Sequence, residues 1–310
     1  MKQPITEPTA LALGNFDGLH RGHALVLQGV KHLAQLMGLQ PGVLLFDEHP
    51  RQVLTGQAPP LLMDGEEKAR RLKDAGFRVL TLSFRETKDL SPAAFADLLG
   101  TQFHAAAVCC GRNYRFGKDA AGPAETLQTL CDSRGITVQI VDDARYKGAL
   151  ISSSRIRRSI ENGEMETANA MLLFPFSYRL PVVPGDKRGR TLGFPTANQF
   201  FLPRMIRPRA GVYASKVLLN GVWYPAVTNI GVRPTIGTET FRSETCILGF
   251  SGDLYGKLLT VFPLHYLRQE QKFKDLAALR TAMEADAAAA KEVLIHDERS
   301  GEAAGQGSLL

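Results

Sequence analysis

The hydrophobic pattern of the chain changes near residue 176, and this change limits the fold more than any other feature. Before it, short apolar runs alternate with amphipathic stretches. Each run leads into a helical pattern or into a loop before one. Gly38 stands where a helix should end, and Ser91-Pro92 where one should begin. This alternation predicts a doubly wound parallel sheet with its ligand crevice at the carboxyl ends of the strands. The expected strands are 11–13, 43–46, 77–82, 105–110 and 137–142.

Beyond residue 176 the pattern is that of a small antiparallel barrel. Asn220-Gly221 joins two apolar runs and is a strong signal for a tight hairpin. The stretch 275–296 lacks glycine and proline and predicts one closing helix. We expect domains at 1–176 and 177–298, followed by a polar tail at 299–310 that should be disordered. The expected strands are 178–183, 211–219, 222–229, 245–250 and 258–264.

Composition is that of a globular protein, with 44% hydrophobic and 22% charged residues. No apolar stretch is long enough to span a membrane, so no membrane partner is expected. The net charge of +6 resides mainly in the second half, which should favour anions: residues 1–176 carry 20 basic and 19 acidic side chains, and residues 177–310 carry 17 and 12. Four cysteines without disulfide or zinc spacing predict small buried residues in a cytoplasmic protein: Cys109, Cys110, Cys131 and Cys246.

The segment 14–23, GNFDGLHRGH, follows the first expected strand and opens the first expected helix. That position offers backbone N–H groups and the positive end of a helix dipole to a phosphate in the crevice. Its glycines allow the backbone to approach a ligand closely. His20 and His23, three residues apart on one helical turn, can both donate hydrogen bonds to phosphate oxygens during nucleotidyl transfer. The alternative is a Gly-rich turn with two surface histidines.

The segment 185–198, GDKRGRTLGFPTAN, concentrates glycine, cations and small oxygen-bearing side chains. It lacks the spacing of a Walker loop. Thr196 and Asn198 would face the same side of an extended chain, where their oxygens suit a magnesium–nucleotide complex. From these residues alone, a basic surface loop that touches RNA or nothing is equally compatible.

The segment 14–23 resembles the G-x-FDG-x-H-x-GH motif of bacterial bifunctional riboflavin kinase/FMN adenylyltransferases, the FAD synthetases of the HxGH nucleotidyltransferase superfamily. Four later segments match this family in order: FDEHP at 46–50, LSPAAF at 90–95, GRNYRFG at 111–117 and ISSSRIR at 151–157. The resemblance implies that His20 and His23 are catalytic and contact the ATP phosphates. It further implies ATP and phosphate contacts at Gly14, Phe16, Asp17, Gly22, Asn113, Arg115, Ser152, Ser153 and Arg157, the last three holding pyrophosphate. Independently, a guanidinium on a Ser-rich helix start suits phosphate geometry.

The second half continues the resemblance, because 185–198 is similar to the riboflavin kinase motif and the segments 211–235, 244–250, 253–257 and 267–273 match in order. The family implies a six-stranded antiparallel barrel in which Thr196 and Asn198 bind Mg²⁺ and ATP phosphates. Glu244 would be the general base that takes the proton of the ribityl 5′-hydroxyl. Further implied contacts are those of Gly185, Lys187 and Gly193 with ATP and of Arg268 and Glu270 with flavin. The implied reactions convert riboflavin and ATP into FMN and ADP, and then FMN and ATP into FAD and pyrophosphate.

The chain departs from the family pattern mainly at 172–185. Phe174-Pro175-Phe176 replaces a Gly-Arg-Pro, Pro181 replaces a glycine, and Pro184 precedes Gly185. Proline fixes φ and has no N–H, so we hypothesise that ATP binding in the barrel is weakened. Two milder departures, Glu48 for proline and Asn113 for aspartate, remove no phosphate ligand.

Two alternatives to a bifunctional enzyme remain. One is an adenylyltransferase whose barrel has lost the kinase step, and the other is a non-catalytic flavin- or RNA-binding regulator. The retained histidines and Glu244 argue against a regulator, and no aromatic-interleaved basic stripe suggests nucleic acid. The sequence leaves the oligomeric state undetermined. For His49, in the FDEHP match, a structural role is favoured over the alternative of a contact in the crevice. We assign no role to His32, His104, His265 and His296.

Overall fold

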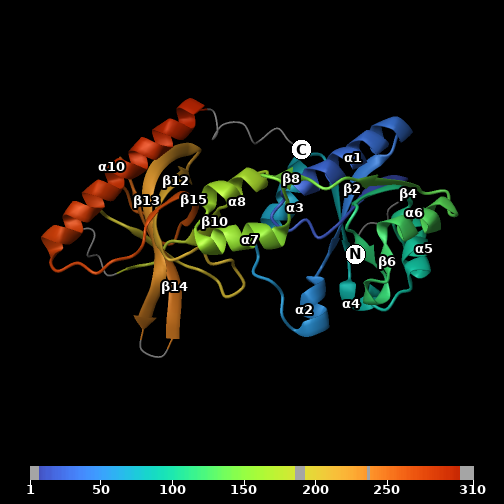
Figure 1. Ribbon diagram of the computed structural model, residues 1–310, viewed down its shortest axis with the longest axis horizontal. Helices are drawn as coiled ribbons and strands as arrows, with labels where there is room; N and C mark the ends of the chain where they lie inside the picture. The colour runs from blue at the N-terminus through green and yellow to red at the C-terminus, as the bar shows by residue number, and fades with distance from the viewer. Residues whose placement is uncertain (1–6, 186–192, 236–237, 301–310) are drawn as a thin grey trace. The chain divides into compact units, whose positions relative to one another are not determined.

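A computed structural model describes residues 7–185, 193–235 and 238–300 (Figure 1). The chain forms two compact units. Within the described residues, the first unit contains 7–59 and 64–153, and the second contains 60–63 and the chain from 154 onward. The boundary between the units therefore falls at the start of the helix α7 (Ser153–Asn162), whereas the sequence pattern changes near residue 176.

The first unit is built on a five-stranded parallel sheet in the order β3-β2-β1-β4-β7, which confirms the predicted doubly wound fold. Chain order reverses between β1 and β4, so the ligand crevice is expected where these two strands end. The elements of this unit are β1 Thr9–Leu13, α1 Arg21–Met37, β2 Gln40–Phe46, α2 Pro50–Thr55, α3 Gly65–Asp74, β3 Arg78–Leu82, α4 Phe84–Thr87, α5 Pro92–Phe103, β4 Ala105–Gly111, β5 Arg115–Phe116, the 3-10 helix η1 Lys118–Ala120, β6 Gly122–Pro123, α6 Ala124–Asp132, β7 Thr137–Val141, β8 Arg145–Tyr146 and β9 Ala149–Leu150.

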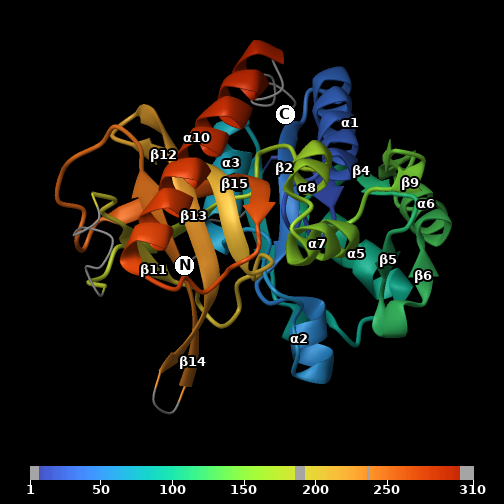
Figure 2. The same cartoon turned by 60° about the vertical axis from the view of Figure 1, so that its left-hand side comes forward.

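Helices cover both faces of this sheet. Helix α1 packs on β1, β2 and β4, and Gly29 allows the close contact, because a Cβ there would lie 2.7 Å from the Cys109 sulfur. Helices α5 and α6 lie side by side (Figure 2) and bury an apolar cluster against Val108 and Cys110, which point away from α1. The predicted caps are confirmed, since Gly38 is left-handed with φ 65° and Ser91 caps α5.

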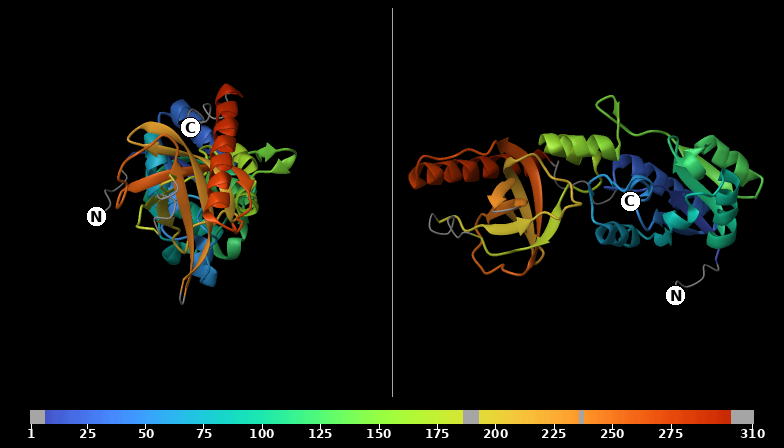
Figure 3. Two further views of the ribbon diagram at one scale, coloured as in Figure 1. Left: turned by 90° about the vertical axis from the view of Figure 1, so that its left-hand side faces the viewer. Right: turned by 90° about the horizontal axis from the view of Figure 1, so that it is seen from below.

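The second unit is built on an antiparallel sheet that curls into a barrel (Figure 3). Its six strands follow the order β10-β15-β12-β13-β14-β11. Its two edge strands meet through a hydrogen bond from Val183 N to Asn198 O (2.8 Å). The buried Gln199 amide also donates to the carbonyls of Leu180 (2.7 Å) and Leu259 (2.8 Å). The sheet is thus a nearly closed barrel, as predicted. The elements of the second unit are α7 Ser153–Asn162, α8 Met165–Met171, β10 Tyr178–Pro181, β11 Ala197–Phe200, β12 Gly211–Leu219, β13 Val222–Thr235, β14 Thr238–Ile247, β15 Leu258–Arg268 and α10 Leu276–Ser300.

Most barrel elements agree with the sequence, and two strands differ. Asn220 (φ 51°) and Gly221 (φ 79°) form the predicted tight turn, and α10 packs on β12, β13 and β15. Strand β11 was not expected, and β14 begins at residue 238 instead of 245. Helix α10 continues to Ser300, and the rest of the predicted tail, 301–310, lies outside the described residues.

Candidate active sites

The predicted phosphate loop, 14–23, connects β1 to α1 and is held by its own side chains. Phe16 (φ 50°) and Leu19 (φ 45°) are in the left-handed region and completely buried. Buried apolar side chains therefore fix a backbone path that is unfavourable for residues other than glycine. Two glycines make room for neighbouring rings: a Cβ at Gly14 would lie 3.2 Å from the Phe16 ring, and one at Gly22 would lie 3.1 Å from the His20 ring.

His20 and His23 cap the first turn of α1 reciprocally. The backbone N–H of His23 donates to His20 Nδ1 (3.3 Å), and the backbone N–H of His20 donates to His23 Nδ1 (3.2 Å). Their rings are stacked with centroids 3.5 Å apart. Because each Nδ1 accepts a hydrogen bond, the proton of each neutral ring is on Nε2. Both histidines can therefore donate from Nε2 to a phosphate.

Burial keeps this histidine pair neutral. It lowers the pKa of His20 to about 4, and His20 is only 8% exposed. Burial also lowers the pKa of His23 well below its usual value, and electrostatic interactions with His20 and with the charge of Lys68 add to this shift. Near pH 7 the pair therefore supplies hydrogen-bond donors without a formal positive charge.

Lys68 is a residue of this site that the sequence analysis missed. It lies in the first turns of α3, and its Nζ donates to the carbonyl of Asn15 in the loop (3.2 Å). Burial lowers its pKa, while the carboxylates of Asp17 and Asp64 act in the opposite direction. A lysine fifty residues from the motif carries no local sequence signal for this contact.

The other predicted residues of the first site occupy three places. Asn113 and Arg115 are exposed and lie just after β4. Because β4 is parallel to β1, the segment that carries them leaves the sheet at the same edge as the loop. Ser153, the last described residue of the first unit, donates from Oγ to the carbonyl of Asp17 in the loop (2.9 Å). Arg157 is 8% exposed, and its Nε donates to the Pro60 carbonyl (2.7 Å). Ser152 is half-buried immediately before α7.

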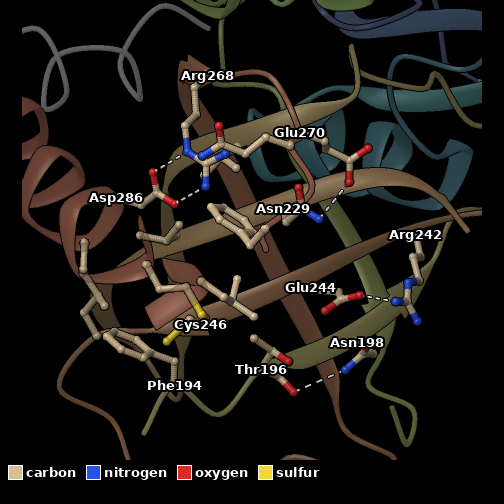
Figure 4. A pocket seen from close by; sticks show the side chains of 18 residues that line it. Phe194, Thr196, Asn198, Asn229, Arg242, Glu244, Cys246, Arg268, Glu270 and Asp286 are labelled. Atoms are coloured by element: carbon tan, nitrogen blue, oxygen red, sulfur yellow. Dashed lines mark hydrogen bonds and ion pairs between the residues drawn. The ribbon is translucent and has the colours of Figure 1, made fainter. Parts of the chain in front are cut away.

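The barrel carries a cavity of ≈ 360 Å³ that brings the predicted kinase residues together. Thr196, Asn198 and Glu244 all line it. Asn198 in β11 pairs directly with Glu244 in β14, so the two side chains are on the same face of the sheet. Arg242, two residues before Glu244, forms an ion pair with its carboxylate (Figure 4). This pair holds the carboxylate in the cavity wall next to the amide.

The same cavity extends to the predicted flavin residues. Figure 4 shows Arg268 and Glu270 toward one end and Thr196, Asn198 and Glu244 toward the other. Glu270 accepts a hydrogen bond from Asn229 Nδ2 (2.9 Å). Its carboxylate lies against Gly231, where a Cβ would be 2.4 Å from both oxygens. A glycine is therefore required at 231 for Glu270 to take this position.

Asp286 of α10 fixes Arg268 in the cavity wall. Its two carboxylate oxygens accept from Nε (2.7 Å) and Nη2 (2.6 Å) of Arg268. Three more residues of α10, Leu279, Met283 and Ala287, line the cavity. The C-terminal helix is thus one wall of the site, a role that the sequence analysis did not give it.

A second cavity of ≈ 660 Å³ adjoins the first and shares Thr196 and Asn198 with it. Gly185 lines this cavity, and a Cβ there would lie 2.3 Å from the Asn198 amide nitrogen. Apolar side chains, among them Phe250 and Tyr255, form much of the remaining wall. Gly193 is exposed with φ 86°, and Lys187 lies outside the described residues.

The departures from the family pattern leave the barrel intact. Pro181 and Pro184 are exposed, and between them Val182 N donates to Lys257 O (2.9 Å) and Val183 N to Asn198 O (2.8 Å). Glu48 forms an exposed ion pair with Arg85. The effect of the prolines on ATP binding stays a prediction.

Several expectations about cysteines and histidines have clear outcomes. All four cysteines are buried and unpaired, as predicted. His49 has a structural contact, because its Nδ1 accepts from Arg51 N (3.1 Å) and caps α2. His265, to which no role was assigned, forms a 2.7 Å hydrogen bond with Glu166 of α8.

Comparisons with known proteins match the two halves of the chain to two family models. The family model of FAD synthetase matches residues 2–155, and that of riboflavin kinase matches residues 172–294. A bifunctional riboflavin kinase/FMN adenylyltransferase of Listeria monocytogenes is 36% identical over 89% of this chain and 89% of its own length. The protein of that name from Escherichia coli (strain K12) is 34% identical over 94% of this chain and 95% of its own length.

A solved structure resembles nearly the whole chain. It is described as a macrolide-efflux protein from Streptococcus pneumoniae, has a TM-score of 0.86 and 31% identity, and covers 92% of this chain and 94% of that one. Its description states another function, and the likeness concerns sequence and fold. Among the described residues here, no helix is long and apolar enough to cross a membrane. The two matched family models and the relatives of similar length show that the chain belongs to the bifunctional riboflavin kinase/FMN adenylyltransferase family.

Proposed function

We propose that the barrel phosphorylates riboflavin with ATP and that the first unit adenylylates the resulting FMN to FAD. The observation that carries the kinase assignment is the position of Glu244, directly opposite Asn198, in a cavity that shares Thr196 and Asn198 with a second cavity. Two adjoining cavities with a common wall suit two substrates that exchange a phosphoryl group. Both volumes are in the range of pockets for small molecules.

In the kinase step, flavin occupies the cavity lined by Glu244 and Arg268, and the nucleotide occupies the cavity lined by Gly185 and Phe250. The oxygen of the ribityl 5′-hydroxyl attacks the γ-phosphorus of ATP, and Glu244 accepts the proton of that hydroxyl. The bond from that phosphorus to the β-phosphate oxygen breaks, and ADP leaves. Positioning supplies most of the catalysis, because phosphoryl transfer has a loose transition state.

Thr196 and Asn198 have the donor atoms that a magnesium ion prefers. Asn198 Nδ2 donates to the Thr196 carbonyl (3.4 Å), so the amide oxygen is the end that remains for a ligand. Together with the Thr196 hydroxyl, it would hold Mg²⁺ through oxygen and leave its other positions to water and phosphate. Bound there, the ion would neutralise charge on the transferred phosphate.

In the adenylylation step, a phosphate oxygen of FMN attacks the α-phosphorus of a second ATP, and pyrophosphate leaves. The FMN phosphate is already an anion, so the protein need not remove a proton. His20 and His23 donate from Nε2 to the phosphate oxygens whose charge increases. Asn113, Arg115, Ser152, Ser153 and Arg157 complete the predicted contacts of this site. We place both reactions in the cytoplasm, because ATP is their substrate and four buried thiols are unpaired.

Product analysis separates the three functions under consideration. The chain is incubated with ATP, Mg²⁺ and either riboflavin or FMN, and flavins are separated by chromatography. Formation of FMN and FAD from riboflavin supports the bifunctional enzyme. FAD from supplied FMN alone supports an adenylyltransferase with an impaired barrel, and no turnover of either flavin supports a binding protein.

A further inference from the structure

The adenylylation site needs a positive charge that its histidines do not supply. A nucleotide triphosphate carries several negative charges, and the transition state moves more charge onto the departing pyrophosphate. His20 and His23 are neutral donors, because burial lowers the pKa of both. Arg21, the basic residue within the loop segment, is exposed. The predicted contacts Arg115 and Arg157 bring charge from other elements, and a cation at the loop itself would add to theirs.

Lys68 occupies that position. Its ammonium group has three N–H donors. Among the described residues it makes one hydrogen bond, to Asn15 O, and no ion pair within 4 Å. Its charge is close enough to His23 to contribute to the low pKa of that ring. Through this contact Lys68 brings at least one further donor to the loop that carries the two histidines.

The position of Lys68 on its helix also indicates a functional reason for a cation. A positive charge near a helix N-terminus is opposed by the helix dipole, so this position disfavours lysine. The two arginines of α3, Arg70 and Arg71, are bound to Glu67 at 2.8 Å and 2.6 Å. Lys73 of the same helix is exposed. Lys68 is a basic side chain of α3 with a hydrogen bond to the loop.

We propose that Lys68 binds the triphosphate of ATP, and then the departing pyrophosphate, together with His20 and His23. Its ammonium group contacts phosphate oxygens and balances the charge that collects on the leaving group as the bond to the α-phosphorus breaks. This inference rests on the proposed adenylylation of FMN by the first unit. It adds a cationic phosphate ligand to that reaction.

The test compares Lys68→Met with Lys68→Arg in the full chain. Lys73→Met is the matched control, because Lys73 lies on the same helix with an exposed side chain. Lys68→Met should lower kcat/KM for ATP in FAD synthesis on the order of 100-fold. This is the effect typical of removing one hydrogen-bond donor that stabilises charge in a transition state. Lys68→Arg should retain most of the activity, and Lys73→Met all of it. FMN formation from riboflavin should be unchanged in every variant, which is an internal control for folding of the barrel.

Binding measurements separate phosphate contact from support of the loop. Calorimetric titration with inorganic pyrophosphate and Mg²⁺ should show at least about tenfold weaker binding to Lys68→Met, with FMN binding unchanged. Equal loss of pyrophosphate and FMN affinity, or unchanged kcat/KM in Lys68→Met, would overturn the proposal. If Lys68→Met does not fold, loss of pyrophosphate affinity must appear in Lys68→Gln for the proposal to hold. Failure of the wild-type chain to make FAD would instead refute the proposed function.

Discussion

Replacement of Asp286 by asparagine should destabilise the second unit measurably. Both carboxylate oxygens of Asp286 accept from Arg268, and the two side chains are 9% and 27% exposed. Asparagine keeps the shape but removes the charge and one acceptor, which leaves the guanidinium partly unpaired. Loss of one partner from a fully buried pair costs about 3–5 kcal/mol, and the partial exposure of Arg268 reduces our expectation to about 2–3 kcal/mol.

Urea unfolding followed by tryptophan fluorescence measures this loss. The chain has one tryptophan, Trp223 in β13, whose ring is 4.9 Å from that of Phe262, so the signal reports on the second unit. Glu284→Gln is the matched control, because it breaks an exposed pair with Arg280 on the same helix and should cost less than about 0.5 kcal/mol. Asp286→Asn should also raise the KM for riboflavin, since Arg268 lines the cavity. Equal stability of the two variants would refute the role of Asp286 as an anchor of α10.

Three further predictions address the two sites. Glu244→Gln should lower FMN formation by at least about 100-fold and spare the conversion of supplied FMN to FAD. Loss of both activities in separate assays would contradict the assignment of the two reactions to two independent sites. Burial places the pKa of His20 at about 4 in the folded chain, against 6.5 when unfolded. The folded state therefore gains stability on the order of 3 kcal/mol above pH 6.5, where the ring is neutral in both states. This stability is lost as the pH falls toward 4. His20→Asn keeps a capping side chain and should show a smaller loss of stability in calorimetry over that interval; an unchanged pH profile counts against the assignment. Pro184→Gly should lower the KM for ATP of the kinase step severalfold, and an unchanged KM refutes the hypothesis that this proline weakens ATP binding.

The parallel sheet could be predicted because its strands are continuous apolar runs covered on both faces. The part of strand β14 before residue 245 could not, for a physical reason visible in its side chains. Ser243 and Thr245 point into the barrel, while Arg242 and Glu244 point into the cavity. Along 242–245 neither face is apolar, so the alternation that marks a half-buried strand is missing from this part of the sequence.

The two sites show the same division between local and distant signals. The histidine pair could be predicted from its spacing, because His20 is the N-cap of α1 and His23 lies in the first turn of the same helix. Lys68 and Asp286 reach their sites from amphipathic helices far along the chain, where one lysine or aspartate has no distinctive local pattern. Residues that a tertiary contact alone brings to a site are therefore the ones that sequence reasoning missed.

The way the barrel closes has a consequence for its dynamics. Strands β10 and β11 meet through one backbone bridge and the side-chain amide of Gln199, whereas every other neighbouring pair has a full ladder. This seam should separate first in thermal fluctuations and exchange its amide protons fastest. Val182 and Ala197, one from each side of the seam, line the ≈ 660 Å³ cavity. A nucleotide in that cavity would bridge the seam and slow its opening, so that substrate binding and barrel rigidity rise together.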